Sequence, residues 1–338
     1  MKKKIRVLVT GSGNGVGQSI IRSLYISKLN LEIIKADIDK VSTDIYDGKK
    51  KLIIPKVENK GSKDWFIKNL VKKKIDVLFV GSEYEIKFFS THKEEIEYKT
   101  KTIICVSPIK TINISLDKFL TYKFLKSHNF PCPKTFLPKN VKDGQKIIKK
   151  MKTPFYLKDR FGTSSRNIYL IKNKKYFKGL YNIVPNPIIQ EFAGYKGEGL
   201  KNEYTCGIFS LKNEKLIGPF IAKRVLKNGT SWIAEVTRQK KIKNLVIQIA
   251  KKLTNVGSLN IQLRNGSKGP IPIEFNARFS GTTSIRAFFG FNEPEMFIKN
   301  YLLKKNIQTP KVKFGKVFRF TEELYLEKNN KTKKINWL

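Results

Sequence analysis

The chain has 338 residues, of which 40% are hydrophobic and 12% aromatic, an ordinary composition for globular proteins of two or three packed units. No apolar stretch reaches the roughly 18 to 20 uncharged residues of a membrane helix, and the start of the chain lacks a signal-peptide pattern. We therefore expect a cytoplasmic protein without membrane segments. The three cysteines and two histidines are widely spaced, which argues against disulfides and a zinc site.

The formal net charge of +41 suggests nucleic acid, an anionic surface or an acidic substrate as a partner. The lysines, however, occur in short runs along the whole chain rather than on one stripe, which is typical of solvated faces. Binding to nucleic acid is therefore the less favoured hypothesis. Arginine is scarce, and several arginines fall near the motifs described below, where a planar bidentate donor would matter.

The first part of the chain alternates between strand and helix patterns. Residues 5–10 predict a buried strand, and a glycine-rich turn then leads into an amphipathic helix that ends near residue 24. Further strands are expected at residues 31–37, 76–81 and 102–106, and further helices at residues 65–73 and 93–98. This alternation predicts a doubly wound parallel sheet over residues 1–108.

The rest of the chain predicts two antiparallel regions. Helices are expected at 116–127 and 141–151, followed by short strands at 155–158, 168–171 and 188–192. A third block has strands at 204–209, 219–225, 258–264 and 271–278, and helices at 242–253 and 293–303. The predicted fold class is thus α/β followed by α+β.

The glycine turn supports an alternative hypothesis. Gly11, Gly13, Gly15 and Gly17 follow a strand and open a helix, as in dinucleotide-binding proteins, and Asp37 could bind ribose hydroxyls. The GxGxxG fingerprint is incomplete, because its last glycine would fall on Val16. An NAD-binding oxidoreductase therefore competes with a structural interpretation, in which the glycines allow close packing and positive φ angles.

The most informative segment is a predicted hairpin near residue 270. Alternate side chains of a strand share a face, so Glu274, Asn276 and Arg278 would line up together, beside Gln262 of the preceding strand. Carboxylate and amide oxygens suit Mg²⁺ shared with phosphates, and an arginine can hold a transferring phosphoryl group. A solvated face of an ordinary hairpin would show the same alternation, so the pattern alone leaves both interpretations open.

Glu-x-Asn-x-Arg at residues 274–278, with Gln262 a dozen residues earlier, resembles the C-terminal lobe of ATP-grasp enzymes. The resemblance is strongest to carboxylate-amine ligases related to the carbamoyl phosphate synthase large chain. It implies Gln262, Glu274 and Asn276 as metal ligands and Arg278 as a catalytic residue that steadies an acyl phosphate.

Other motifs follow in the order of that family. Leu116-Asp117-Lys118 resembles the helix that opens the ATP-grasp domain, which implies that Lys118 contacts ATP phosphate. Lys158 and residues 162–166 resemble the strand lysine and the loop that closes over the phosphates, and they imply a catalytic and nucleotide-binding role for Lys158 and nucleotide contacts for Ser164 and Ser165. The loop departs from the family in having Thr163, Ser164 and Ser165 in place of a glycine run.

The segment that links the two lobes of ATP-grasp enzymes is similar to residues 188–193. The nucleotide-binding residues that the resemblance implies here are Gln190, Glu191, Phe192, Ala193 and, on the next strand, Glu203. Lys223 and Arg224 could bind an anionic substrate, and Arg286 would face the acceptor or the carboxylate.

The resemblance covers nearly the whole chain. It implies a pre-ATP-grasp Rossmann-like domain at residues 1–108, the N-terminal lobe at 109–190, the C-terminal lobe at 191–310 and a tail at 311–338. It implies a ligase that uses ATP and Mg²⁺, with Mn²⁺ as an alternative ion, to join a small-molecule carboxylate, activated as an acyl phosphate, to an amine. The substrates could be anionic, no membrane partner is expected, and a homodimer is compatible with the family.

Overall fold

The computed structural model describes residues 4–44, 50–163, 166–195, 200, 202–267, 269–320, 325–326 and 332–333. The chain forms two compact units. Unit 1 comprises Met1–Val106, Phe279–Val312 and Val317–Leu338, and unit 2 comprises Ser107–Arg278 and Lys313–Lys316. Residues 279–310, which the sequence analysis assigns to the C-terminal lobe, thus fall in the unit of the N-terminal sheet.

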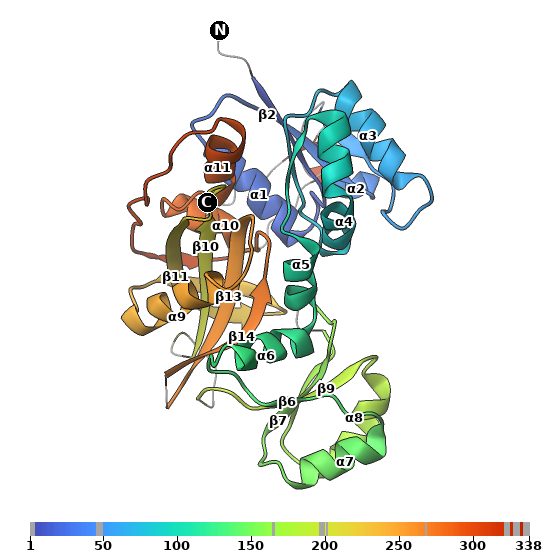
Figure 1. Ribbon diagram of the computed structural model, residues 1–338, viewed down its shortest axis with the longest axis vertical. Coiled ribbons are helices and arrows are strands. Elements are labelled where there is room, and N and C mark those ends of the chain that lie inside the picture. The colour runs from blue at the N-terminus through green and yellow to red at the C-terminus, as the bar shows by residue number, and fades with distance from the viewer. Residues whose placement is uncertain are drawn as a thin grey trace. The chain divides into compact units, whose positions relative to one another are not determined.

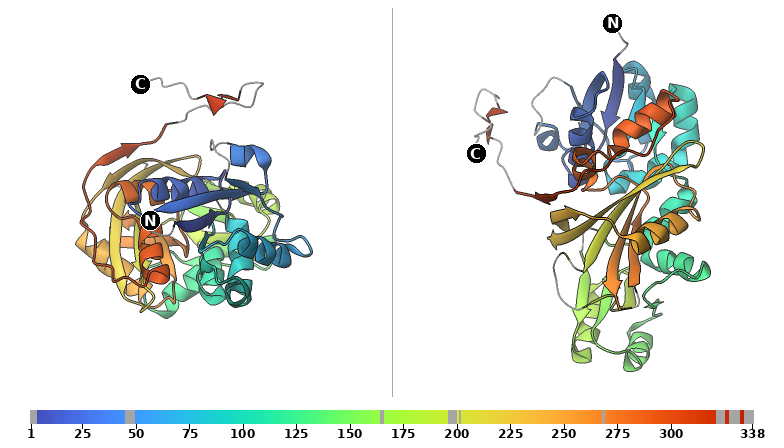
Figure 2. Two further views of the ribbon diagram at one scale, coloured as in Figure 1. Left: turned by 90° about the horizontal axis from the view of Figure 1, so that it is seen from above. Right: turned by 90° about the vertical axis from the view of Figure 1, so that its left-hand side faces the viewer.

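Unit 1 is built on a five-stranded parallel sheet of order β3-β2-β1-β4-β5. Its strands are β1 (Ile5–Val9), β2 (Leu31–Asp37), β3 (Lys51–Ile53), β4 (Val77–Phe79) and β5 (Ile103–Cys105). Its helices are α1 (Gly15–Tyr25), α2 (Lys40–Asp44), α3 (Ser62–Lys72) and α4 (Glu83–Thr100). The strand order reverses direction at β1, so right-handed crossovers place helices on both faces (Figures 1 and 2). The predicted doubly wound sheet is confirmed.

A later segment completes unit 1. It contains α10 (Thr283–Phe288) and α11 (Glu293–Phe297), which continues as the π-helix η2 (Ile298–Leu302). These helices pack against α1: Ser19 Oγ donates to Ser284 Oγ over 2.9 Å, and Asn292 Nδ2 donates to the Ser23 carbonyl over 2.9 Å. Two short strands, β16 (Tyr325–Leu326) and β17 (Thr332–Lys333), pair antiparallel.

Unit 2 begins with the N-terminal lobe, whose antiparallel sheet has the order β6-β9-β7-β8. The strands are β6 (Thr135–Phe136), β7 (Phe155–Asp159), β8 (Ile168–Ile171) and β9 (Pro187–Glu191). The helices are α5 (Ile109–Leu116), α6 (Lys118–Ser127), α7 (Val141–Lys149), the 3₁₀ turn η1 (Lys174–Tyr176) and α8 (Phe177–Ile183).

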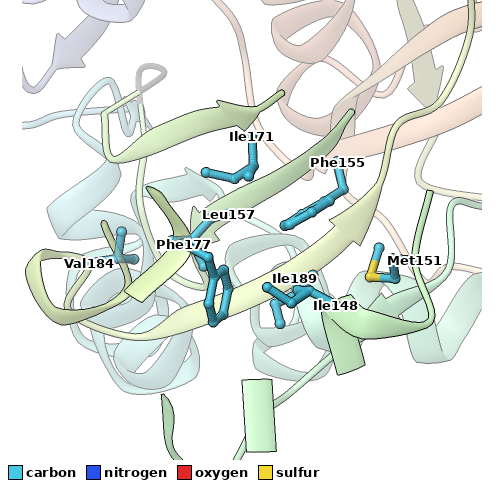
Figure 3. Close-up of a cluster of buried hydrophobic side chains, with 8 residues drawn as sticks. All are labelled: Ile148, Met151, Phe155, Leu157, Ile171, Phe177, Val184 and Ile189. Carbon is cyan, nitrogen blue, oxygen red and sulfur yellow. The ribbon is translucent and has the colours of Figure 1, made fainter. Parts of the chain in front are cut away.

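One face of this sheet carries the core of the lobe. Phe155, Leu157 and Ile189 project from β7 and β9 toward Ile148 and Phe177, which lie on α7 and α8 (Figure 3). Because successive strand residues point to opposite faces, Tyr156 and Lys158 of β7 project from the other side. The apolar cluster thereby fixes which face of β7 presents polar groups.

The C-terminal lobe of unit 2 is a six-stranded sheet of order β14-β13-β10-β11-β12-β15. Its strands are β10 (Glu203–Ser210), β11 (Leu216–Lys227), β12 (Thr230–Val236), β13 (Gly257–Gly266), β14 (Gly269–Asn276) and β15 (Lys316–Phe318), and α9 (Lys240–Ala250) packs on the sheet. β13 and β14 form the expected hairpin, in which Gln262 lies opposite Glu274 and Asn260 opposite Asn276. The predicted two-lobed antiparallel architecture is confirmed. Among the described residues, no helix is long and apolar enough to cross a membrane.

Some elements differ from the expected ones. The helix expected at 93–98 is the 18-residue α4, which starts at Glu83; its buried residues Ile86, Phe89 and Ile96 are separated by so many charged residues that its apolar stripe is weak in the sequence. The helix expected at 116–127 is α6, which begins after its cap Asp117, and a separate helix, α5, precedes it. The elements that were not expected are β3, β6, β12, β15, β16, β17, α2, α5, α8 and α10.

Candidate active site

Lys158 lies at the centre of the polar face of the N-terminal lobe. Its side chain is buried, and Nζ donates to Gln190 Oε1 over 2.8 Å and lies 4.5 Å from the centroid of the Tyr156 ring. Gln190 Nε2 in turn donates to Thr135 Oγ1 over 2.9 Å, which fixes the orientation of the amide. Burial chiefly, and then the charge of Lys118, lower the pKa of Lys158 to about 8, although Glu274 and Glu203 act in the opposite direction.

Lys118 is the first residue of α6 and is held against the loop that follows β7. Its backbone N–H donates to the Arg160 carbonyl over 3.1 Å, and its Nζ donates to the Gly162 carbonyl. The helix start and the loop after β7 are thus joined on both the backbone and the side chain of Lys118. Ser164 and Ser165, the predicted nucleotide contacts of this loop, lie outside the described residues.

Asp117 and Arg160 form an ion pair that we call the clasp. Arg160 donates from Nε to Asp117 Oδ1 over 2.8 Å and from Nη2 to Oδ2 over 2.5 Å, a bidentate geometry that suits guanidinium and carboxylate. The same Asp117 Oδ1 caps α6 by accepting from the N–H groups of Phe119 and Leu120. One carboxylate therefore orients both Lys118 and the loop.

The hairpin of β13 and β14 brings together the predicted metal ligands. Asn276 Nδ2 donates to Glu274 Oε1 over 3.1 Å, so these two side chains share one face. Gln262 lies opposite Glu274, but its Oε1 accepts from Arg224 Nη2 over 2.7 Å. Arg224 is buried and also pairs with Glu203, to which its Nε donates over 3.0 Å. Among the predicted ligands, Glu274 and Asn276 are the pair that the geometry favours.

The donor set on this hairpin fits a hard cation. Within the described part of the chain, no three His, Cys, Asp or Glu residues gather in a way that could hold a metal ion. Carboxylate and amide oxygens such as those of Glu274 and Asn276 suit Mg²⁺, which completes its shell with water and phosphate oxygens. The hairpin could thus hold Mg²⁺ together with a nucleotide.

The sequence analysis missed an aromatic pair in unit 2, near Lys158. The rings of Tyr156 and Phe192 stack with centroids 5.7 Å apart and an interplanar angle of 17°. Arg264, from β13, donates to Tyr156 Oη over 3.0 Å and lies 5.1 Å from the centroid of the Phe192 ring. Flat aromatic faces beside cationic groups can bind a purine base. The alternation of residues 155–158 could have indicated Tyr156, because it places Tyr156 on the face of Lys158.

The remaining predicted site residues have different surroundings. Glu191 points to the face opposite Lys158, and its Oε2 accepts from the Lys134 N–H over 3.2 Å. Ala193 is buried directly after β9, and Arg278 follows the end of β14 by two residues. Lys223 lies 3.5 Å from Glu235.

Arg286 belongs to the interior of unit 1. It pairs with Glu293 over 3.0 Å and donates to Ser280 and Thr282, and both charged side chains are buried. A side chain enclosed in this way cannot face a substrate, so the expectation for Arg286 was wrong.

The glycine turn of unit 1 has a packing explanation. A Cβ on Gly17 would lie 2.0 Å from the Gly11 carbonyl oxygen, so the start of α1 approaches the turn as closely as only glycine allows. The carboxylate of Asp37 accepts from the Gly13 N–H over 2.9 Å. These contacts favour the structural interpretation of the turn over the dinucleotide hypothesis.

Comparison with known proteins shows what parts of this chain are similar to. Residues 200–323 match the model of a family described as ATP-grasp in the biosynthetic pathway with Ter operon. Over 99 residues the chain is 30% identical to the coenzyme gamma-F420-2:alpha-L-glutamate ligase of Methanocaldococcus jannaschii; this match covers 28% of the chain and 34% of the ligase. The chain thus spans about a third of the length of that curated relative.

Solved structures match over much more of the chain. An N5-carboxyaminoimidazole synthetase from Staphylococcus aureus in complex with ADP has a TM-score of 0.70 at 15% identity, over 92% of this chain and 81% of that one. A biotin carboxylase domain from Hydrogenobacter thermophilus, solved as a dimer with MgADP and bicarbonate, has a TM-score of 0.71 at 15% identity, over 94% of this chain and 74% of that one. At this identity the likeness establishes the fold.

The two lobes around Lys158 and the β13–β14 hairpin have the fold of these solved structures. The C-terminal part of the chain, residues 200–323, is similar to the ATP-grasp family associated with the Ter operon. The resemblance seen in the sequence motifs is confirmed.

Proposed function

We propose that the protein is an ATP- and Mg²⁺-dependent ligase that activates a carboxylate and joins it to an amine. The observation that carries the proposal is that the charges of Lys118 and Glu274 both act on Lys158 within unit 2, where Asn276 binds Glu274 and Tyr156 stacks on Phe192. We refer to this region as the proposed nucleotide cleft. The relatives support it, since one is a ligase of glutamate and another was solved with MgADP.

In the proposed reaction, a carboxylate oxygen of the acid attacks the γ-phosphorus of ATP, and ADP leaves. The amine then attacks the carbonyl carbon of the acyl phosphate, inorganic phosphate leaves, and the nitrogen loses a proton to give the amide. Both steps place negative charge on phosphate oxygens, so catalysis depends on cationic groups held in position.

The residues of the chain have distinct roles in this proposal. Lys158 and Lys118 hold the phosphates, Tyr156 and Phe192 contact the base, and Arg278 steadies the acyl phosphate. Glu274 and Asn276 would hold Mg²⁺, which would neutralise phosphate charge, and Mn²⁺ would accept the same oxygen ligands. The Gln262 amide is oriented by Arg224 and supports this pair from the facing strand.

The proposal also covers the substrates of the protein, its location and its oligomeric state. The substrates are small molecules, of which the acid is anionic, and the site of action is the cytoplasm, where ATP is available. A homodimer is proposed by analogy with the dimeric biotin carboxylase domain.

Thermal unfolding with ATP, GTP and NAD, each with and without Mg²⁺, tests the nucleotide part of the proposal. We expect stabilisation by ATP with Mg²⁺ in the native protein and in the control Lys178→Ala, whose lysine is exposed on α8, and loss of this effect in Lys158→Ala and Glu274→Ala. ADP and phosphate release with panels of acids and amines then tests the ligation. Stabilisation by NAD alone would contradict the proposal, as would an ATP response that both variants retain.

A further inference from the structure

A cavity opens on the α7 side of the N-terminal lobe, within unit 2. Its volume is about 790 Å³, which lies in the range of roughly 300 to 1,000 Å³ that small-molecule sites occupy. It is bounded by the start of β6, the end of α7, the segment from α7 to β7 and the end of β9. Its lining residues are Lys134, Phe136, Lys146, Ile147, Lys150, Met151, Lys152, Thr153, Pro154, Glu191 and Phe192.

This cavity is separate from the proposed nucleotide cleft. On β9, Gln190 faces Lys158, whereas the next residue, Glu191, points to the opposite side, as strand alternation requires. On β7 the residues facing the α7 side are Phe155 and Leu157, which belong to the apolar cluster (Figure 3). The sheet and its core therefore lie between the two sites.

The charges around the cavity are mostly positive. Four lysines line it, and Glu191 is its one carboxylate, already engaged by the Lys134 N–H over 3.2 Å. Lys146 and Lys150 lie four residues apart on or next to α7 and so project from the same side of the helix. An anion in the cavity would be within reach of several ammonium groups.

The floor of the cavity is apolar. Phe136 and Ile147 pack against the core cluster, and Met151 belongs to it, while Pro154 contributes a further apolar surface. A small inorganic anion would leave this surface exposed to water. The combination of apolar floor and lysine-rich lining suits an organic anion with an apolar body, because burial of apolar surface adds to the charge attraction.

We propose that this cavity binds an organic anion that carries an aromatic or other apolar body and a carboxylate, sulfonate or phosphate group. One residue connects it to the nucleotide cleft, since Phe192 lines the cavity and also stacks on Tyr156. A ligand that contacts Phe192 would therefore change the affinity of the cleft for nucleotide, and nucleotide would change the affinity of the cavity for the ligand by the same factor.

The test uses 8-anilinonaphthalene-1-sulfonate, a fluorescent aryl sulfonate, as the probe on the full chain. We expect one saturable site, with binding at least tenfold weaker in the double variant Lys146→Gln/Lys150→Gln. The matched control is Lys142→Gln/Lys149→Gln, which removes the same charge from α7 at residues outside the cavity lining and should bind as the native protein does. Circular dichroism confirms that each variant is folded.

Further binding measurements distinguish this proposal from the proposed function. Binding of the probe should persist in Lys158→Ala, because the cavity does not use the nucleotide cleft, and inorganic sulfate should compete only weakly. Equal loss in both double variants would show diffuse charge attraction and overturn the proposal, and loss in Lys158→Ala would place the probe in the cleft. With the probe saturating, an unchanged affinity for ADP would overturn the coupling through Phe192.

Discussion

Lys158 occupies an environment that distinguishes it from the many surface lysines of the chain. It is buried on the polar face of β7 and surrounded by Gln190, Tyr156 and the charge of Lys118. A lysine in this position can lose its proton near neutral pH, so its charge depends on what binds beside it. A bound phosphate would restore the charge that burial disfavours.

This leads to a prediction about pH. The pKa of Lys158 is about 8 in the free protein, and bound phosphate should raise it, so ATP affinity should be constant below pH 8 and fall up to about tenfold per pH unit above it. Titration of ATP binding between pH 6 and 10 measures this, and Lys158→Arg, which keeps its charge, should remove the decline. Affinity that is flat across this range in the native protein would contradict the prediction.

The clasp gives a second prediction at the same scale. Asp117→Asn keeps a good cap for α6 but removes the charge that binds Arg160, so stability should change little while ATP affinity falls as much as in Arg160→Ala. Asp117→Ala also loses the cap and should cost about 1 kcal/mol more. Denaturant unfolding and ATP titration of the three variants check this; normal ATP affinity in Arg160→Ala would show that the clasp is only structural.

The sequence predicted part of the arrangement of the candidate site, for a physical reason. Glu274 and Asn276 alternate on one strand, and the turn that follows β13 fixes their partner, so local rules suffice to bring them together. The contacts of Arg224 with Glu203 and Gln262 join three strands, and nothing local in the sequence indicates them. The stacking of Tyr156 on Phe192 was missed for the same reason, since Tyr156 lies on β7 and Phe192 follows β9.

Among the elements, four of the five strands of the parallel sheet were predicted, and β3 was missed. β2 coincides with the expected residues 31–37, and its residues 33–37 are buried. α5 was missed because its Ile and Thr residues have low helix propensity. Tertiary contacts outweigh that propensity: Thr111 and Ile112 are buried, and Thr111 Oγ1 donates to the Thr254 carbonyl over 2.6 Å.

Close packing between elements of unit 1 gives a third prediction. A Cβ on Gly81, which follows β4, would lie 2.2 Å from the Thr10 carbonyl oxygen, and a backbone atom cannot move aside easily. Gly81→Ala should therefore cost about 1 to 3 kcal/mol. Gly179→Ala is the control, since Gly179 lies in α8 with nothing within 4 Å of its Cβ position, and it should be neutral or stabilise by up to about 1 kcal/mol.

Denaturant unfolding of both glycine variants decides whether packing explains the turn. A normal stability of Gly81→Ala would mean that the strand ends tolerate a side chain, and the structural interpretation of the neighbouring glycine turn would weaken with it. The two variants together separate the general effect of glycine replacement from the local clash.

At the scale of the whole molecule, pH acts on stability through a buried acid in unit 1. Burial, opposed by a hydrogen bond with Thr10 and aided by the charges of Asp37 and Glu58, raises the pKa of Glu85 to about 7. The folded protein thus holds a proton that the unfolded chain releases near its ordinary pKa of 4.5. The stabilising contribution is fully present below pH 4.5 and is lost as the pH rises through 7.

The fourth prediction follows from this loss of stability with rising pH. Glu85→Gln mimics the protonated acid, so the variant should be more stable than the native protein at pH 8, by up to about 3 kcal/mol, and close to it at pH 5. Glu94→Gln, at an exposed position of the same helix, should show no such pH-dependent gain. Thermal unfolding at both pH values measures the difference, and an equal effect of Glu85→Gln at pH 5 and pH 8 would contradict it.

The ion pair between Arg224 and Glu203 has a consequence for the order of events at the proposed site. Arg224 offsets the negative charge of Glu203 and also binds Gln262. Among the predicted metal ligands, Glu274 is then the one with a negative charge. A single carboxylate attracts free Mg²⁺ only weakly. The ion should therefore arrive and depart as part of the nucleotide complex. Turnover would then follow the concentration of MgATP rather than that of free magnesium.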